Sequence, residues 1–190
     1  MTPFKILIYC WLLILSTFSW NATAGVSGLL LVAQHNGDHY TLLVKDRTRA
    51  YFELPAGHSE AGDKLNDGQI DLETSYETAL RETVEETRGY LGRRLLTQAS
   101  NSMQRIRYGE FEMFLTHIPM FDLSEISNIR VPQKDNWNPM REIIDYAWVN
   151  IQQLHNSKGA KVTNMQGQII HVHSSLPAEI KIAQAQGWFK

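Results

Sequence analysis

Apolar residues follow a strand-like pattern in the first part of the chain and a helical one after it. Residues 26–34 form an apolar run, and residues 39–45 alternate back after the turn Asn36-Gly37-Asp38. A short strand is expected at residues 50–54, before a loop that contains glycine and proline. Helical spacing then covers residues 74–88. The pattern predicts a hairpin, a third strand and a long helix.

The second half of the chain predicts further strands and two helices. Strands are expected at residues 95–98, within residues 103–118 with a break at Gly109, and at residues 145–149. Helices are expected at residues 151–155 and 177–185, the latter with Pro177 in its first turn and Gly187 beyond its end. Residues 121–141 are predicted to be irregular. Strands and helices in this order indicate a mixed α/β domain.

The helix at residues 74–88 carries an acidic cluster. Glu85 and Glu86 follow Glu82 by three and four positions, so the three carboxylates project within about a quarter of the helix circumference. The apolar face opposite holds Tyr76, Leu80, Thr83, Val84 and Leu91. Like charges this close repel one another, and bound divalent cations would relieve the repulsion. The alternative is a solvated acidic face, which by itself is the more common explanation of Glu-x-x-Glu-Glu.

The residues upstream of this helix extend the acidic cluster into a longer motif. With Leu54-Pro55-Ala56-Gly57, the chain resembles the Nudix hydrolase family, whose signature is Gly, five residues, Glu, seven residues, Arg-Glu, an apolar residue, any residue, Glu-Glu, any residue, Gly. Gly57 and Asp63 fit its first half, with Asp in place of Glu. Glu73 precedes Arg81-Glu82 by the right distance and fits the second half. An insertion, residues 64–73, separates the halves, and Glu73 is preferred over Asp63 as the first acid.

Two positions depart from the family's pattern. Thr83 stands where an aliphatic residue is usual, and Arg88 stands where glycine is expected. Because Gly89 follows at once, we expect the helix to run one residue longer before its C-terminal glycine. The resemblance implies an α/β/α sandwich around a mixed sheet. It covers most of residues 26–155, with Tyr146-Ala147-Trp148-Val149 looking like the family's last core strand, and leaves the tail from about Gly159 unexplained.

The resemblance also implies an activity, namely metal-dependent hydrolysis of a nucleoside diphosphate linked to another moiety. The substrate classes expected are ADP-ribose, dinucleoside polyphosphates and nucleotide sugars, with Mg²⁺ or Mn²⁺ as the cofactor. Glu82 and Glu86 would be the main metal ligands, and the carbonyl of Gly57 a further one. Glu85 would be a ligand or the base towards water, so the catalytic assignment is Glu85 with Glu82. The alternative function is a Nudix-like domain that binds a nucleotide or a partner without turnover.

Several residues could support these groups. Arg81 can pair with Glu85, four residues on, or with Glu73, and so hold the loop against the helix. Outside the motif, Glu110 and Glu112 are candidates for an additional acid, and Arg105 and Arg107 for gripping phosphate. For both pairs, the alternative is that these side chains alternate along an exposed strand and simply face solvent.

Four other polar or aromatic positions have simpler explanations. His171 and His173 have metal-ligand spacing but no evident third ligand, which favours a surface strand. His58 is interpreted as a polar loop residue. Trp137 could stack on a base or simply be partly buried in its loop.

The N-terminus predicts export. In residues 1–24, Lys5 is the only charge, residues 6–18 are almost wholly apolar, and Ala22-Thr23-Ala24 ends the segment. This layout is typical of a cleavable secretory signal, and an uncleaved membrane anchor is the alternative. Cleavage before Gly25 would leave one domain, residues 25–190, destined for the periplasm or the exterior. The one cysteine of the chain, Cys10, would be lost with the signal, which excludes a disulfide.

The net charge of the chain limits the classes of partner that we expect. The whole chain has a formal charge of −2, and removal of Lys5 leaves 17 basic and 20 acidic residues. A slightly acidic chain without a basic patch offers no general field for nucleic acid. We therefore expect a small nucleotide as the partner.

Overall fold

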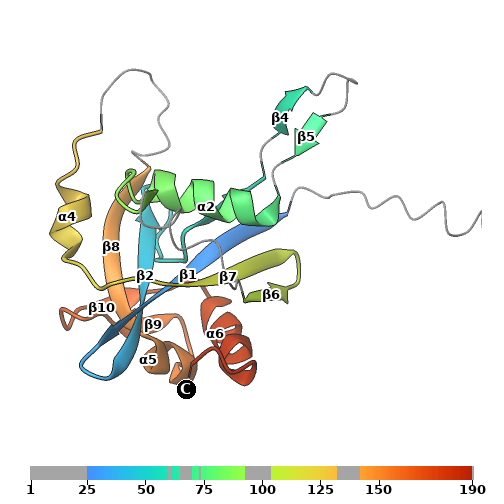
Figure 1. Cartoon of the computed structure of the whole chain (residues 1–190). Coiled ribbons are helices and arrows are strands. Elements are labelled where there is room, and N and C mark those ends of the chain that lie inside the picture. Colours follow the sequence, from blue (N-terminus) through green and yellow to red (C-terminus); the bar gives the residue numbers. More distant parts are fainter. Residues whose placement is uncertain are drawn as a thin grey trace, which may run out of the picture.

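The computed structural model describes residues 25–59, 61–64, 70–72, 74–92, 104–131 and 142–189 (Figure 1). Several predictions lie outside the described residues: the signal peptide at residues 1–24, the strand at residues 95–98, Glu73, Trp137 and most of the 64–73 insertion. Of the described helices, none is long and apolar enough to cross a membrane.

A mixed sheet forms the centre of the described structure. Its strands are β1 (Val26–His35), β2 (Asp38–Asp46), β3 (Ala56–His58), β6 (Arg105–Tyr108), β7 (Phe111–His117) and β8 (Ile143–Asn150). The order across the sheet is β6-β7-β1-β2-β8, and β3 also pairs with β1. β1 runs parallel to β7 and antiparallel to β2 and β3. Since β7 occupies one edge of β1, both β2 and β3 use its other edge, at opposite ends of the strand.

Two small ribbons lie outside this sheet. One consists of β4 (Ala61–Lys64) and β5 (Ile70–Leu72), which extends away from the body beside the start of α2 (Figure 1). The other consists of β9 (Lys161–Thr163) and β10 (Ile169–His171).

Helices cover both faces of the sheet. They are α2 (Ser75–Glu86), α4 (Leu123–Ser127), α5 (Ile151–Asn156) and α6 (Leu176–Ala185), with α2 on one face and α5 and α6 on the other (Figure 1). Alternate residues of β1 show the two layers: Leu29 and Leu31 pack with Ala79 of α2, whereas Leu30 and Val32 pack with Ile180 of α6. Both sides of β1 are therefore buried, which explains its unbroken apolar run. The predicted α/β/α sandwich is confirmed.

The start of α2 is capped as its sequence allows. The Thr74 hydroxyl accepts a hydrogen bond from the Glu77 N–H at 3.3 Å, and the Glu77 carboxylate accepts one from the Thr74 N–H at 2.9 Å. This capping box satisfies two N–H groups at the start of the helix. The threonine in the aliphatic position of the motif, Thr83, is buried and donates its hydroxyl to the Ala79 carbonyl at 2.8 Å. A polar side chain is thus accommodated on the buried face.

The end of α2 differs from the prediction. The helix stops at Glu86 and does not continue past Arg88, because Arg88 itself adopts a left-handed backbone with φ +54°. This conformation costs a residue other than glycine about 1 kcal/mol. The Arg88 guanidinium offsets the cost by donating to the carbonyls of Ser127, Ile129 and Ile143 at 2.9, 3.4 and 3.1 Å.

The strand expected at residues 50–54 is also wrong. Phe52 and Glu53 form only isolated bridges, with Val172 and Val44 respectively, and the strand itself comes later, as β3. The two residues bond to different segments of the chain, so no continuous ladder forms. Pro55 follows and brings no N–H to pair.

Residues 121–141, predicted to be irregular, and the tail, which the resemblance leaves unexplained, both contain regular elements, and the helix predicted at residues 177–185 is confirmed as α6. α4 lies within residues 121–141, where Asp122 and Glu125 form a second capping box and Ile126 is fully buried. The tail from Gly159 forms β9, β10 and α6. Its apolar side chains join the core beneath β1: Val162, Ile170, Val172, Leu176, Ile180, Ala183 and Trp188. The tail is therefore part of the domain.

Candidate functional site

The loop glycine of the motif lies directly against the acidic helix. β3 crosses the side of α2 that carries the carboxylates, and a Cβ built on Gly57 would fall 2.1 Å from the Glu82 carboxylate carbon. A side chain at position 57 would therefore displace the Glu82 carboxylate, and glycine leaves it in this position.

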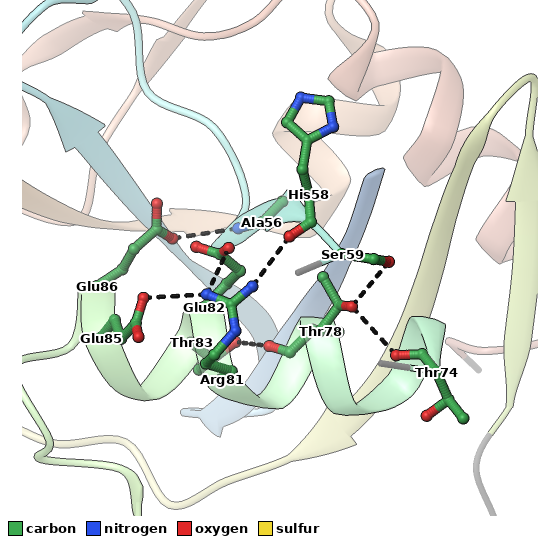
Figure 2. A network of polar contacts seen from close by, with 11 residues as sticks. Ala56, His58, Ser59, Thr74, Thr78, Arg81, Glu82, Thr83, Glu85 and Glu86 are labelled. Carbon is green, nitrogen blue, oxygen red and sulfur yellow. Dashed lines mark hydrogen bonds and ion pairs between the residues drawn. The ribbon is translucent and has the colours of Figure 1, made fainter. Parts of the chain in front are cut away.

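Arg81 ties the helix to the same loop (Figure 2). Its guanidinium contacts Glu82 at 2.9 Å and Glu85 at 3.2 Å, and it donates to the His58 carbonyl at 2.9 Å. The predicted Arg81–Glu85 pair is confirmed, while the alternative partner Glu73 lies outside the described residues. These three side chains are about four-fifths buried, so the contacts fix the orientation of the carboxylates on the helix.

Glu86 points to the other end of β3. Its carboxylate accepts a hydrogen bond from the Ala56 N–H at 3.1 Å (Figure 2). Desolvation by the surrounding protein raises the pKa of Glu86 well above its ordinary value, and the negative charges of Glu82 and Glu53 raise it further. The helix end beside it is held by the Tyr146 hydroxyl, which donates to the Glu86 carbonyl at 2.8 Å.

Glu53 is an acidic residue of the site that the sequence analysis did not select. It precedes Leu54-Pro55 directly, forms an ion pair with Arg49, and contributes to the field at Glu86. Burial raises the pKa of Glu53, and Arg49 opposes this rise. The signal that could have identified Glu53 from the sequence is a charged residue between two apolar neighbours at the edge of the motif.

A cleft of about 480 Å³ lies beside β3. Residues from four parts of the chain line it: Arg49, Tyr51, Glu53 and Leu54; Val26, Ala56, Gly57 and His58; Tyr108, Glu110 and Phe111; and His173, Ser175, Leu176 and Glu179. The α2 carboxylates are absent from this lining, whereas Gly57, whose backbone lies against the Glu82 carboxylate, is part of it. Glu53 connects the two regions, since it lines the cleft and its charge acts on Glu86.

The four candidates outside the motif lie on the β6–β7 hairpin. Glu112 lies in register with Ser27, which lies in register with Gly57, so the three form one row across the sheet. At about 4.8 Å between strands, Glu112 is about 10 Å from Gly57. Arg105 lies 3.9 Å from Glu112, whereas Arg107 is exposed and donates to the Gly109 carbonyl at 3.1 Å. Glu110 lies in the turn and lines the cleft.

The remaining polar candidates lie in different parts of the structure. His171 is exposed on β10, as predicted for a surface strand. His173 is partly buried in the cleft, with its ring 4.9 Å from that of Tyr51. His58 contributes its carbonyl to Arg81, and its ring points away from the α2 carboxylates (Figure 2). The structure describes only the backbone of Asp63, which lies in β4.

The donor set suits a hard divalent cation that keeps most of its own ligands. Within the described residues, no three His, Cys, Asp or Glu side chains converge into a ready metal cage. Mg²⁺ seldom needs such a cage, since it binds through one or two carboxylates together with water and substrate phosphates. The negative charges of Glu82 and Glu86 repel one another, and the Gly57 backbone lies against the Glu82 carboxylate. The residues therefore fit Mg²⁺ or Mn²⁺.

Searches of known proteins found matches in structure only. No protein-family model and no curated protein matches the chain. An Ap4A hydrolase from C. elegans, solved as a binary complex, matches with 13% identity and a TM-score of 0.49, covering 88% of this chain and 100% of that one. The Nudix domain of NrtR from Shewanella oneidensis, complexed with ADP ribose, matches with 13% identity and a TM-score of 0.45, over 98% and 99% of the two chains.

A third solved structure covers part of a longer protein. It is a bifunctional NMN adenylyltransferase/ADP ribose pyrophosphatase from Francisella tularensis, complexed with AMP and a Mn ion. The identity is 16% and the TM-score 0.48, over 96% of this chain and 46% of that one. Likenesses this distant carry no inference about substrate or activity, which must come from the residues of this chain.

Proposed function

We propose that this protein is a Nudix-type, metal-dependent pyrophosphohydrolase that cleaves a nucleoside diphosphate linked to another moiety. The observation that carries the proposal is the close passage of β3 over the acidic face of α2. Gly57 leaves room for the Glu82 carboxylate, the Ala56 N–H binds Glu86, and Arg81 orients Glu82 and Glu85. A solvated acidic helix face would need none of these contacts with a loop that is distant in the sequence.

Each group of the site has a distinct role in this proposal. Glu82 and Glu86, with the Gly57 carbonyl, would hold Mg²⁺ or Mn²⁺. When bound, the ion supplies charge neutralisation for the diphosphate and acidifies the attacking water. Glu85, held by Arg81 at 3.2 Å, is placed beside these ligands as a further ligand or as the proton acceptor. Arg81 is a positioning residue, because it contacts Glu82, Glu85 and the His58 carbonyl and so holds the carboxylates and the loop together.

The proposal is tested by phosphate release from the purified protein. The panel contains ADP-ribose, dinucleoside polyphosphates and nucleotide sugars, each with Mg²⁺, with Mn²⁺ and with chelator, and with a coupled phosphatase where the products are monophosphates. We expect chelator-sensitive turnover that falls at least about a hundredfold in Glu82→Gln and Glu86→Gln. Glu142→Gln is the matched control, because Glu142 is an exposed carboxylate that lies just before β8 and outside the motif. Turnover unaffected by chelator would contradict the proposal.

One observation favours the second candidate, a domain that binds a nucleotide without turnover. Arg81 already neutralises part of the charge on Glu82 and Glu85, so the cluster is compensated in part without a cation. Melting temperatures measured with the same panel separate the two candidates. A nucleotide that raises the melting temperature but is not hydrolysed, with or without metal, would support the binding domain.

We also propose that the protein is exported. The support is the sequence of residues 1–24, with its apolar run and its small residues before Gly25. In a bacterial host that expresses the whole chain, we expect the protein in the periplasmic fraction or the medium. Mass spectrometry of that protein should show Gly25 as the first residue. An intact N-terminus in the membrane fraction would indicate the uncleaved anchor instead.

A further inference from the structure

The far end of the cleft is made by the tail of the chain. His173, Ser175 and Glu179, from the segment that the Nudix resemblance does not cover, face Tyr108 and Phe111 of the β6–β7 hairpin. The cleft volume of about 480 Å³ lies within the range of small-molecule sites, roughly 300–1,000 Å³. The cleft as a whole therefore has the size of a ligand site, and residues of the tail line part of it.

Glu179 places a hydrogen-bond acceptor at this end of the cleft. It is only 8% exposed, and it also lines a small adjoining recess with Ile106, Met113 and Ile182. Desolvation raises the pKa of Glu179, while a hydrogen bond from Ser175 and the charge of His173 oppose the rise. A buried carboxyl costs free energy unless it is hydrogen-bonded. It can accept hydrogen bonds in either protonation state, so it suits a ligand that brings N–H donors.

Aromatic rings surround this acceptor. Tyr108 lines the cleft and is 42% exposed, although it is a large aromatic residue. Phe111 lies on the same hairpin, and the rings of Tyr51 and His173 pack edge to face at 4.9 Å. Exposed rings beside a polar acceptor are typical of sites that bind flat heterocycles, since bases stack on aromatic faces.

The negative charge of the lining residues disfavours phosphate at the Glu179 end of the cleft. Glu179 and Glu110 are both acidic, and the nearest guanidinium in the cleft, that of Arg49, is paired with Glu53. Phosphate is better placed beside Gly57, which lines the cleft and whose backbone lies against the Glu82 carboxylate. A nucleotide bound in this direction has its base towards α6 and its diphosphate towards Gly57.

We infer that the α6 end of the cleft binds the nucleobase of the substrate, and that an amino-bearing base donates its N–H groups to the Glu179 carboxyl. This inference rests on the proposed function and names its substrate-specificity residues. Adenine, guanine and cytosine carry an exocyclic amine that Glu179 can accept from. Uracil instead flanks its single N–H donor with carbonyls, which would face the carboxyl unfavourably.

The inference is tested by calorimetric binding of AMP, GMP, CMP, UMP and ribose 5-phosphate to the purified protein in chelator. We expect at least one amino-bearing nucleotide to bind about tenfold or more tightly than UMP and ribose 5-phosphate. Glu179→Met should remove this preference by weakening that nucleotide about 10- to 100-fold, the effect of losing a hydrogen bond to a charged group. Lys181→Met, on the exposed side of the same helix, should leave it unchanged.

A second variant tests the inference if the Glu179→Met protein does not fold. Tyr108→Leu changes an exposed ring, and we expect it to weaken the preferred nucleotide while leaving ribose 5-phosphate unaffected. In turnover, Glu179→Met should raise KM for an amino-bearing substrate more than it lowers kcat, because it removes binding that is shared by ground and transition states. Equal binding of all five ligands, or a preference that survives in a folded Glu179→Met, overturns the inference.

The binding assay also separates this inference from the proposed function. Binding in chelator needs neither metal nor hydrolysis. If the base preference is present but no substrate is hydrolysed, the pyrophosphohydrolase proposal fails and the base site stands. If hydrolysis is chelator-sensitive but no base is preferred, the base site fails and the hydrolase stands.

Discussion

Gly57 is the residue at which steric fit and proposed chemistry coincide. A methyl group at this position would displace the Glu82 carboxylate, whose carbon lies 2.1 Å from the ideal Cβ. Because that carboxylate ends a flexible side chain, it can move at little cost to folding. We expect Gly57→Ala to lower turnover about a hundredfold or more while the melting temperature changes little.

A matched glycine provides the control for this variant. A Cβ on Gly159 would meet open space, so Gly159→Ala should alter neither turnover nor melting temperature. Full activity in Gly57→Ala would show that the position of the Glu82 carboxylate does not matter for the reaction.

Glu86 makes the stability of the metal-free protein depend on pH. Burial raises its folded-state pKa well above 4.5, so between the two pKa values the folded state binds more protons than the unfolded state. Stability is therefore lost as pH rises from about 4.5 through the folded-state pKa. In chelator, we expect Glu86→Gln to be more stable than the parent at pH 8, by on the order of 1 kcal/mol.

Urea unfolding of both proteins at pH 5 and pH 8 measures this difference. The advantage of Glu86→Gln should shrink at the lower pH, where the parent carboxyl is protonated to a greater extent. An advantage that is the same at both pH values would contradict the raised pKa.

At the scale of elements, the end of α2 depends on one side chain. Arg88 has a left-handed backbone, and its guanidinium bonds to carbonyls near α4 and at the start of β8. We expect Arg88→Ala to lower the free energy of unfolding by about 2–3 kcal/mol, because it keeps the backbone strain and loses the donors. Arg88→Gly relieves the strain, so it should be about 1 kcal/mol less destabilised.

Urea unfolding again provides the measurement for Arg88. If the alanine variant matched the parent in stability, the carbonyl contacts would contribute nothing.

Local sequence predicted elements well where one strand or helix carries its own signal. The Asn36-Gly37 turn, the break at Gly109 and the Pro177 start of α6 all lie where they were expected. Prediction from local sequence failed where an element depends on a partner that is distant in the sequence. β3 exists because Ser27 and its neighbours on β1 accept it as a third strand, and nothing in residues 56–58 indicates this. The capping box of α4 was a local signal for a helix, but the prolines nearby favoured the prediction of an irregular segment.

At the scale of the whole molecule, the tail completes the second layer of the sandwich. Ile180 of α6 is fully buried against the core beneath β1, whereas Ile169 of β10 is 72% exposed. We expect Ile180→Ala to cost about 2–5 kcal/mol of unfolding free energy, as for other large-to-small core substitutions. Ile169→Ala, the same chemical change, should cost less than about 0.5 kcal/mol.

Thermal or urea unfolding compares the two isoleucine variants directly. Similar losses in both would mean that α6 does not contribute to the cooperative core.

The sequence by itself determined the acidic face of α2, the mixed α/β class and the Arg81–Glu85 pair, because helix and strand periods and four-residue spacing are local properties. Tertiary structure alone decided that β3 passes over Glu82, and that Glu53, His173 and Glu179 meet in one cleft. These residues are brought together by strand pairing and by the packing of the tail. Such contacts depend on the closure of long chain segments, and no short pattern encodes them.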